Sequence, residues 1–300
     1  MNGYKKIFRS TKMRHAILRI LSFIPDKQML SLQYRIKMGQ RLNLNNPQTF
    51  TEKLQWYKLY YRDPVMTKCA DKHLVREYLA ERGYKDLSCV EYGVYDKPED
   101  INLSELPKRF VLKTTNGSGT NIICKDKSKF DLQKNQKELH DWLKRDCYGL
   151  GREWAYKDIE PKIIAEEYLE DEENEFDGIN DYKFICFNGK VHYVVFDADR
   201  YVGHKRSIFD AEWNYIDVGT DCEKLGDTVL KPEGFEEMKK IAEDLSKDFP
   251  FVRVDLYWVN HRAYFGELTF YPWTGYIVFD PRSFDFELGE KFLLPANYMI

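Results

Sequence analysis

The sequence predicts an α+β protein in which a helical N-terminal region precedes two lobes of mixed strands and helices. Helical patterns dominate up to about residue 65, and short β-rich runs bounded by turn residues take over beyond Gly83. No internal repeat or low-complexity linker interrupts the chain. We therefore expect one continuous unit with three segments, at residues 1–64, 65–169 and 170–300.

The composition is that of an ordinary soluble globular protein. Its 300 residues are 43% hydrophobic and 15% aromatic, which is enough for a large buried core. The six cysteines are widely spaced, and no CxxC pair or Cys/His cluster has the spacing of metal ligands. Buried free thiols in a reducing cytosol are therefore expected.

The first 41 residues are strongly basic, with ten Lys and Arg against Asp26 alone. Their longest apolar stretch, Ala16–Ile24, is interrupted by Arg19 and is too short to span a bilayer. Two interpretations stay open: a packed helix with a solvated basic face, which we favour, and a segment that contacts an anionic membrane surface or a lipid-linked glycan. The chain is expected in the cytoplasm, and at the inner face of the plasma membrane under the second interpretation. Nucleic-acid binding is not expected, because no recognition module follows.

The expected first lobe begins with a helix over Asp71–Arg82 and contains four strands and a second helix. The strands are expected at Cys89–Tyr95, Arg109–Thr114, Asn121–Lys125 and Lys162–Leu169, with the helix over Leu132–Tyr148 between the last two.

The expected second lobe opens with a hairpin. Strands over Tyr182–Phe187 and Lys190–Phe196 flank Asn188-Gly189, a dipeptide that favours a type I′ turn. An amphipathic helix is expected over Glu233–Lys247, followed by strands over Phe251–Val259 and Ala263–Phe270.

Residues 109–120 suit phosphate binding. Lys113 lies near the end of a strand, and Gly117 and Gly119 let backbone N–H groups approach anionic oxygens. The segment is not a Walker loop, because the GxxxxGK[ST] spacing is absent and a strand is expected to follow. Taken alone, it is better explained by an ordinary hairpin turn.

Two strands near the C-terminus each carry an acidic side chain among apolar residues. If an odd loop centred on His261 joins them, Asp255 lies opposite Glu267 and Arg253 opposite Thr269. Two facing carboxylates need a cation between them, and oxygen ligands without Cys or His select Mg²⁺. The alternative is a hairpin face with salt-bridged charges, and the pattern alone does not decide.

Five features in this order resemble the ATP-grasp superfamily. They are Asp71-Lys72, the Lys113 loop, residues 166–169 (Glu-Glu-Tyr-Leu), residues 181–183 (Asp-Tyr-Lys), and Arg253 and Asp255 with Glu267. More narrowly, residues 46–56 and 266–272 are similar to the teichuronopeptide-biosynthesis (TupA-like) branch, which is often found with capsule and cell-wall polysaccharide genes. The resemblance covers roughly residues 46–295 and implies the ATP-grasp fold, in which two α+β lobes sandwich ATP.

The resemblance also implies a set of ligand contacts. The nucleotide-binding residues would be Lys72, Lys113, Asn116, Gly117, Ser118, Gly119, Thr120, Glu166, Glu167, Tyr168 and Leu169. The lysines would meet the phosphates, Glu166 would lie beside the adenine amino group, and the backbone of residues 167–169 would read the base edge. Asp255 and Glu267 would hold Mg²⁺. Thr269 stands where related ligases carry Asn, so it is left out of the metal ligands.

The implied activity is an ATP-dependent carboxylate–amine ligase that forms an amide through an acyl phosphate. Arg253 would stabilise an oxyanion, and Lys183 would contact phosphate or the carboxylate substrate, so both are expected catalytic residues. A uronate, glutamyl or other acidic glycan carboxylate and an amino acid or another amine are the expected substrates, in surface polysaccharide or teichuronopeptide biosynthesis. Arg200, Lys205 and Arg206 suit an acidic glycan, although a solvated surface loop explains them equally well.

Three other functions stay open. A glycosyltransferase of polysaccharide biosynthesis would need a metal-binding Asp-x-Asp, and Asp197-Ala-Asp199 has these letters but continues into a basic loop. An ATP-grasp kinase would phosphorylate a hydroxyl instead of joining an amine. The unusual Thr269 also allows a degenerate nucleotide-binding module.

Overall fold

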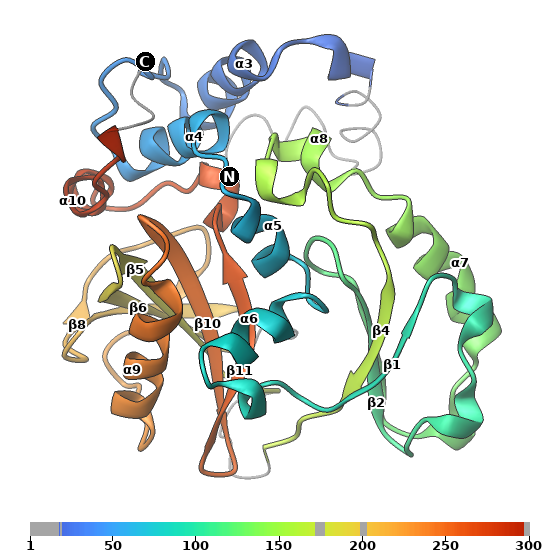
Figure 1. Ribbon diagram of the computed structural model, residues 1–300. Helices are drawn as coiled ribbons and strands as arrows, with labels where there is room; N and C mark the ends of the chain where they lie inside the picture. Colours follow the sequence, from blue (N-terminus) through green and yellow to red (C-terminus); the bar gives the residue numbers. More distant parts are fainter. Residues whose placement is uncertain (1–17, 19, 172–177, 199–202, 297–300) are drawn as a thin grey trace.

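Two lobes and a set of connecting helices make up the computed structural model, which describes residues 18, 20–171, 178–198 and 203–296 (Figure 1). Within these residues the first lobe contains a four-stranded sheet and the second a seven-stranded sheet. Helices cover both sheets, so the predicted α+β class is confirmed. No helix in this part of the chain is both long and apolar enough to cross a membrane.

Two helices before the first sheet begin at capping side chains that the sequence supplies. The Thr49 hydroxyl accepts a hydrogen bond from the Glu52 N–H, and the Glu52 carboxylate accepts one from the Thr49 N–H, which makes a capping box. Asp63 caps the next helix, with Pro64 at its first position. The helices are α3 (Asp26–Met38), α4 (Phe50–Tyr60), α5 (Pro64–Ala70) and α6 (Val75–Glu81).

The first sheet has the order β1-β4-β2-β3, and all of its neighbours are antiparallel. Its strands confirm the four predicted ranges to within two residues: β1 (Glu91–Tyr95), β2 (Phe110–Thr114), β3 (Asn121–Cys124) and β4 (Ile163–Glu167). The prediction of one helix over Leu132–Tyr148 is wrong. The chain forms α7 (Leu132–Leu143) and α8 (Cys147–Gly151), because Asp146 accepts a 2.6 Å hydrogen bond from the Gly149 N–H and starts a new helix.

The second sheet has the order β11-β10-β5-β6-β7-β8, with β9 beside β7. Asn188 and Gly189 have φ of 50° and 75°, as the predicted type I′ turn requires. The strands are β5 (Asp181–Phe187), β6 (Lys190–Ala198), β7 (Lys205–Asp210), β8 (Tyr215–Ile216), β9 (Glu223–Lys224), β10 (Phe251–Val259) and β11 (Arg262–Thr269). The remaining helices are α9 (Phe235–Ser246), as predicted, and α10 (Ser283–Lys291).

Short 3-10 turns complete the described chain. They are η1 (Leu21–Phe23), η2 (Lys85–Leu87), η3 (Pro98–Asp100), η4 (Leu103–Glu105), η5 (Lys127–Lys129), η6 (Trp154–Tyr156) and η7 (Pro272–Gly275).

The turn between β10 and β11 differs from the predicted one. Val259 pairs with Arg262, so the loop holds two residues and the predicted odd loop centred on His261 is wrong. A bulge at Gly266 adds one residue to β11 and restores the predicted pairing of Asp255 with Glu267.

Opposite faces of the second sheet pack against different helices. On one face α9 covers the sheet, with Phe235 against Phe184 at 6.1 Å. The other face is covered at one end by α4 and the segment after α10, where Phe50 and Phe292 surround Phe251. Because side chains alternate between the two faces of a strand, Arg253 and Asp255 of β10 and Lys183 of β5 lie on the same face as Phe251, further along the strands.

Hydrophobic packing ties the connecting helices to the second lobe. Buried residues of α4, α5 and α6 share one core with the second sheet, whereas the first sheet and α7 form a separate, smaller core. The division at residues 1–64, 65–169 and 170–300 stays a prediction, but α5 and α6 pack with the lobe that follows them later in the chain. Their placement lets them approach the space between the lobes.

Candidate functional site

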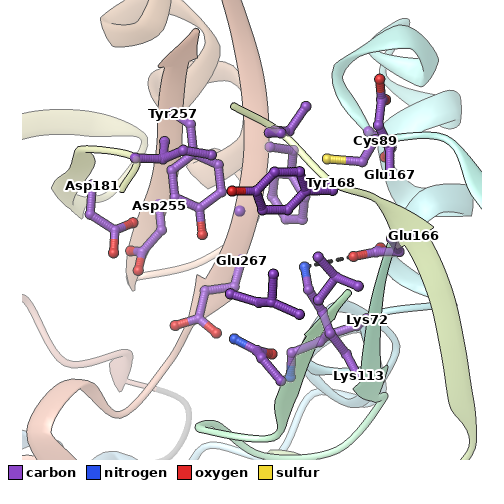
Figure 2. Close-up of a pocket in the computed structure, with 18 of the residues that line it drawn as sticks. Lys72, Cys89, Lys113, Glu166, Glu167, Tyr168, Asp181, Asp255, Tyr257 and Glu267 are labelled. Atoms are coloured by element: carbon purple, nitrogen blue, oxygen red, sulfur yellow. Dashed lines mark ion pairs between the residues drawn. The ribbon is translucent and has the colours of Figure 1, made fainter. Parts of the chain in front are cut away.

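A cleft of about 630 Å³ separates the two lobes, and both contribute to its walls. Lys72 and Lys113 line one side, and Asp255 and Glu267 face them from the second lobe (Figure 2). The apolar part of the lining comes from Val75, Val111, Ile123, Leu169 and Phe265. A cleft with a cationic side, an acidic side and an apolar part suits a nucleotide.

The turn between β2 and β3 forms one edge of this cleft. Gly117 and Gly119 have φ of 67° and 70°, a region that glycine adopts without strain. Ser118 and Gly119 line the cleft, whereas Asn116 and Thr120 are buried. The structure therefore presents the tip of the predicted phosphate loop to a ligand, with Asn116 and Thr120 supporting it from below.

Lys72 ties the helices to this loop. Its N–H donates a 3.1 Å hydrogen bond to the Thr115 carbonyl, and its ammonium donates one to the Gly117 carbonyl. Burial lowers the pKa of Lys72; Glu267 opposes this shift and Lys113 adds to it. Lys72 is thus within electrostatic reach of both Lys113 and Glu267, and all three line the cleft.

Glu166 is held by two cations. Its carboxylate lies 2.6 Å from the Lys113 ammonium (Figure 2) and 2.8 Å from the Arg76 guanidinium. Burial alone would raise the pKa of Glu166, but Lys113 and Arg76 outweigh it and lower that pKa. For Lys113, burial lowers the pKa but the neighbouring Glu166 raises it overall. Both groups are therefore ionised at neutral pH.

Arg76 on α6 is a cleft residue that the sequence did not reveal. It belongs to no recognisable motif, and its partner Glu166 lies 90 residues further along the chain. Only the packing of α6 beside β1 and β4 brings the two together.

The hinge after β4 lines the same cleft with Glu167, Tyr168 and Leu169, as predicted for a base-binding segment. The Glu167 N–H donates a 2.9 Å hydrogen bond to the Val90 carbonyl. This N–H is therefore already paired within the protein.

Arg253 lies among the side chains of the predicted metal site. Its guanidinium donates hydrogen bonds to Asp255 at 2.7 and 2.6 Å, to Glu267 at 3.2 Å and to Thr269 at 3.1 Å. The predicted pairings of Asp255 with Glu267 and of Arg253 with Thr269 are confirmed. All four side chains meet on one face, and Arg253, Asp255 and Glu267 line the cleft.

The two facing carboxylates differ in acidity. Burial raises the pKa of Asp255 to about 6, although Arg253 and Lys183 oppose it. Burial also acts on Glu267, but there Arg253 and Lys72 outweigh it and lower the pKa to about 2. Glu267 is thus firmly anionic, and a cation that binds beside it would also favour the ionised form of Asp255.

The donor set of this face fits Mg²⁺. Mg²⁺ is usually held by one or two carboxylates together with waters and substrate phosphate oxygens. Asp255 and Glu267 supply two such carboxylates, and Arg253 shows that the pair accommodates positive charge. Within the described ranges, no three His, Cys, Asp or Glu side chains form a group able to hold a metal ion. A metal held here by the two carboxylates would complete its coordination with waters or phosphate oxygens.

Lys183 on β5 is the cross-strand partner of Asp255 and lies on the same face. Its ammonium is 2.5 Å from Asp181 and 3.6 Å from both Asp197 and Asp255. The side chain is 6% exposed, and Lys183 does not line the cleft as Asp181 and Asp255 do. In this arrangement Lys183 neutralises and positions carboxylates at the cleft wall.

The three cations predicted to bind an acidic substrate have different positions. Arg200 lies outside the described residues. Lys205 is half-buried on β7. Arg206 is buried and forms a two-pronged ion pair with Asp197, at 2.6 and 3.2 Å, so its charge is already matched within the protein.

Comparison with known proteins gives a family and a set of distant structural relatives. The family model described as TupA-like ATPgrasp matches residues 52–293. A D-alanine–D-alanine ligase from Bacillus anthracis is 19% identical, with a TM-score of 0.41 over 67% of this chain and 56% of that chain. A phosphoribosylamine–glycine ligase from Thermotoga maritima is 13% identical, with a TM-score of 0.41 over 68% and 48% of the two chains.

A RimK-domain ATP-grasp protein from Sphaerobacter thermophilus is 9% identical, with a TM-score of 0.38 over 73% of this chain and 59% of that chain. The chain thus spans about half the length of these solved structures. No curated protein matches the sequence. The predicted family resemblance and the predicted ATP-grasp fold are confirmed by the family model, which covers most of the chain from α4 to the segment after α10. The chain belongs to the TupA-like ATP-grasp family.

Proposed function

We propose that this protein is an ATP-dependent carboxylate–amine ligase that binds Mg-ATP between its lobes. The observation that supports this most is the meeting of two walls across one cleft. Asp255 and Glu267 lie with Arg253 on one wall, and Lys72 and Lys113 lie on the other. The cationic side chains on one wall thus face the carboxylates on the other wall. Membership of an ATP-grasp family indicates that the nucleotide bound between them is ATP.

Each part of the cleft has a role in holding the nucleotide. Lys72, Lys113 and the loop tip at Ser118 would meet the phosphates, and Glu166 would accept a hydrogen bond from the amino group of adenine. Tyr168 would lie beside the base with the apolar lining. Bound between Asp255 and Glu267, Mg²⁺ would neutralise charge on the phosphate oxygens.

Two chemical steps follow from this arrangement. A substrate carboxylate oxygen attacks the γ-phosphorus in line, the bond to the bridging oxygen breaks, and ADP leaves. The amine nitrogen then attacks the acyl carbon. The bond between this carbon and the phosphate oxygen breaks, phosphate leaves with the electron pair of that bond, and the nitrogen loses a proton. Lys72 and Lys113 would balance charge in the first step, and Arg253 would stabilise the oxyanion in the second. Lys183 would keep Asp181 and Asp255 in place.

A uronate or glutamyl carboxylate and an amino acid or other amine are the proposed substrates, in surface polysaccharide or teichuronopeptide assembly. The match to the TupA-like family, together with the resemblance of that family to teichuronopeptide-biosynthesis proteins, supports this choice. The structure disfavours a glycosyltransferase that uses Asp197 as a metal ligand, because Asp197 is buried against Arg206 and Lys183. Contact of the basic N-terminus with a membrane or a lipid-linked glycan stays a prediction, since six of its ten Lys and Arg residues lie outside the described residues.

The test is product analysis with the full chain. Mg-ATP, a panel of uronates and glutamyl peptides, and an amino acid are expected to give ADP, phosphate and an amide only when both organic substrates are present. Hydroxylamine, offered as the amine, is expected to trap the acyl phosphate as a hydroxamate. Arg253→Met should abolish amide formation, while Arg82→Met, which removes a surface ion pair with Asp248, should retain it. A stable phosphoester without amine consumption would indicate a kinase instead, and ATP-independent sugar transfer would indicate a glycosyltransferase.

A further inference from the structure

The first sheet has a pair of carboxylates on neighbouring strands, as the second sheet has in Asp255 and Glu267. Glu91 on β1 is the direct cross-strand partner of Glu166 on β4. Like charges in this position repel each other and destabilise the pair. Arg76 relieves the repulsion, because its Nη2 lies 2.8 Å from Glu166 and its Nε lies 3.2 Å from Glu91. Its Nη1 donates a 2.8 Å hydrogen bond to the Cys89 carbonyl, which fixes the guanidinium in one orientation.

Glu166 contacts two cations, Arg76 and Lys113, and we expect Lys113 to contact the phosphates as well once a nucleotide binds. Lys113 lies 2.6 Å from Glu166 but also lines the same cleft as the loop that would hold the phosphates. A triphosphate carries more charge than one carboxylate and would draw the flexible lysine side chain away. Arg76 is anchored at three points and stays where it is. The Glu166 side chain is only 8% exposed, so it must retain a cation to remain ionised.

We propose that Arg76 is the positioning residue for base selection: it holds the Glu166 carboxylate ionised and aimed at the base while Lys113 moves to the phosphates. A fixed carboxylate accepts a hydrogen bond from the 6-amino group of adenine and repels the 6-oxo group of hypoxanthine or guanine. Lys113 thus contacts the triphosphate, and Arg76 acts on the purine edge through Glu166. The inference rests on the proposed binding of ATP in this cleft.

The matching ligands are ATP and inosine triphosphate, which differ at position 6 of the base. Calorimetric titration of the wild-type chain in Mg²⁺ is expected to show ATP bound about 10- to 100-fold more tightly than inosine triphosphate, because a buried acceptor is left facing another acceptor in the second case. In Arg76→Met this ratio should fall below about threefold, mainly through weaker ATP binding. Arg82→Met, at the residue that follows α6 and away from the cleft, should keep the wild-type ratio.

Lys113→Met separates the two roles. It should weaken both nucleotides by similar factors and keep their ratio, because Arg76 still holds Glu166. If Lys113→Met loses the ratio and Arg76→Met keeps it, Lys113 orients the carboxylate and the proposal is overturned. Equal weakening of both nucleotides in Arg76→Met overturns it as well.

A purely structural role for Arg76 is tested by removing the charge it balances. The double variant Arg76→Met with Glu91→Gln restores charge balance between β1 and β4, so it is expected to recover folding stability but not base selection. Recovery of the wild-type ratio in this variant would show that Arg76 only supports the fold. If Arg76→Met does not fold, the double variant and Arg76→Lys, which keeps the charge but cannot bridge both carboxylates, are each expected to lower the ratio.

Failure of this inference differs from failure of the proposed function. A wild-type chain that binds ATP and inosine triphosphate equally well retains its nucleotide site but refutes base selection through Glu166. A wild-type chain that binds neither nucleotide refutes the proposed function, and this inference with it.

Discussion

Asp255 and Glu267 face each other across β10 and β11 although the turn between these strands holds only two residues. An unbroken ladder from the Val259–Arg262 pair would set Asp255 opposite Gly266 and turn Glu267 to the other face of the sheet. The bulge at Gly266 adds the missing residue, so the carboxylate pair depends on one glycine.

Gly266→Ala is therefore expected to disturb both the fold and the metal site. An added Cβ would lie 2.9 Å from the Asp255 carbonyl oxygen and 3.2 Å from the Tyr257 ring. We expect a loss of about 1–3 kcal/mol of stability by chemical denaturation and Mg-dependent ATP binding at least about tenfold weaker. Gly203→Ala is the control, since an added Cβ there has nothing within 4 Å. Unchanged stability and binding in Gly266→Ala would show that the bulge does not set the carboxylate pair.

This hairpin also shows what the sequence predicts and what it leaves out. Alternation along the strands correctly placed Arg253 and Asp255 on one face. The assumed odd loop then set Asp255 opposite Glu267 and Arg253 opposite Thr269, which are the observed partners. A bulge and an odd loop give the same offset, and only the pairing of Val259 with Arg262 in the structure distinguishes them. The pairing was therefore predicted correctly from the wrong turn.

The ion pairs between residues far apart in the chain could not be predicted from the sequence, for a different reason. The strands that carry Lys113 and Glu166 were predicted from local patterns, because strand signals act over a few residues. Arg76 and Glu91 gave no local signal, since each acquires its role only when α6 packs beside β1 and β4. Arg206 was likewise predicted to contact substrate, but the pairing of β6 with β7 places it opposite Asp197.

Arg206→Met tests whether this arginine stabilises the fold or binds substrate. Removing it leaves the buried Asp197 without its two-pronged partner, so we expect a loss of about 3 kcal/mol of stability in denaturant unfolding. The double variant with Asp197→Asn should recover much of that loss. Full stability in Arg206→Met, combined with weaker binding of acidic glycans alone, would assign Arg206 to the substrate site instead.

Lys58 gives a pH-dependent prediction. This buried lysine donates 2.9 Å hydrogen bonds to the carbonyls of Gly151 and Thr274, and burial lowers its pKa to about 7, although Glu153 opposes the shift. Between pH 7 and about 10 the unfolded chain holds a proton on Lys58 that the folded chain releases, so stability rises with pH in this window. The wild type should gain stability relative to Lys58→Met as pH rises from 7 to 10.

Thermal unfolding across that range measures the difference, and subtracting the variant cancels the titration of groups that do not interact with Lys58. Lys68→Met, which removes an exposed lysine paired with Glu77 and Glu81, is the control and should show little pH-dependent difference in this window. A difference between wild type and Lys58→Met that shrinks or stays constant as pH rises would contradict the lowered pKa of Lys58.

Calorimetric titration of ATP with and without Mg²⁺, in the wild type and in Glu267→Gln, tests most directly whether the facing carboxylates hold a metal for the nucleotide. Thr269→Val is the control, because Thr269 shares the hydrogen-bond network of Arg253 but is not assigned to the metal. Mg²⁺ should strengthen ATP binding by at least about tenfold in the wild type and in Thr269→Val, and by little in Glu267→Gln. A wild-type dependence on Mg²⁺ that survives unchanged in Glu267→Gln would place the metal elsewhere.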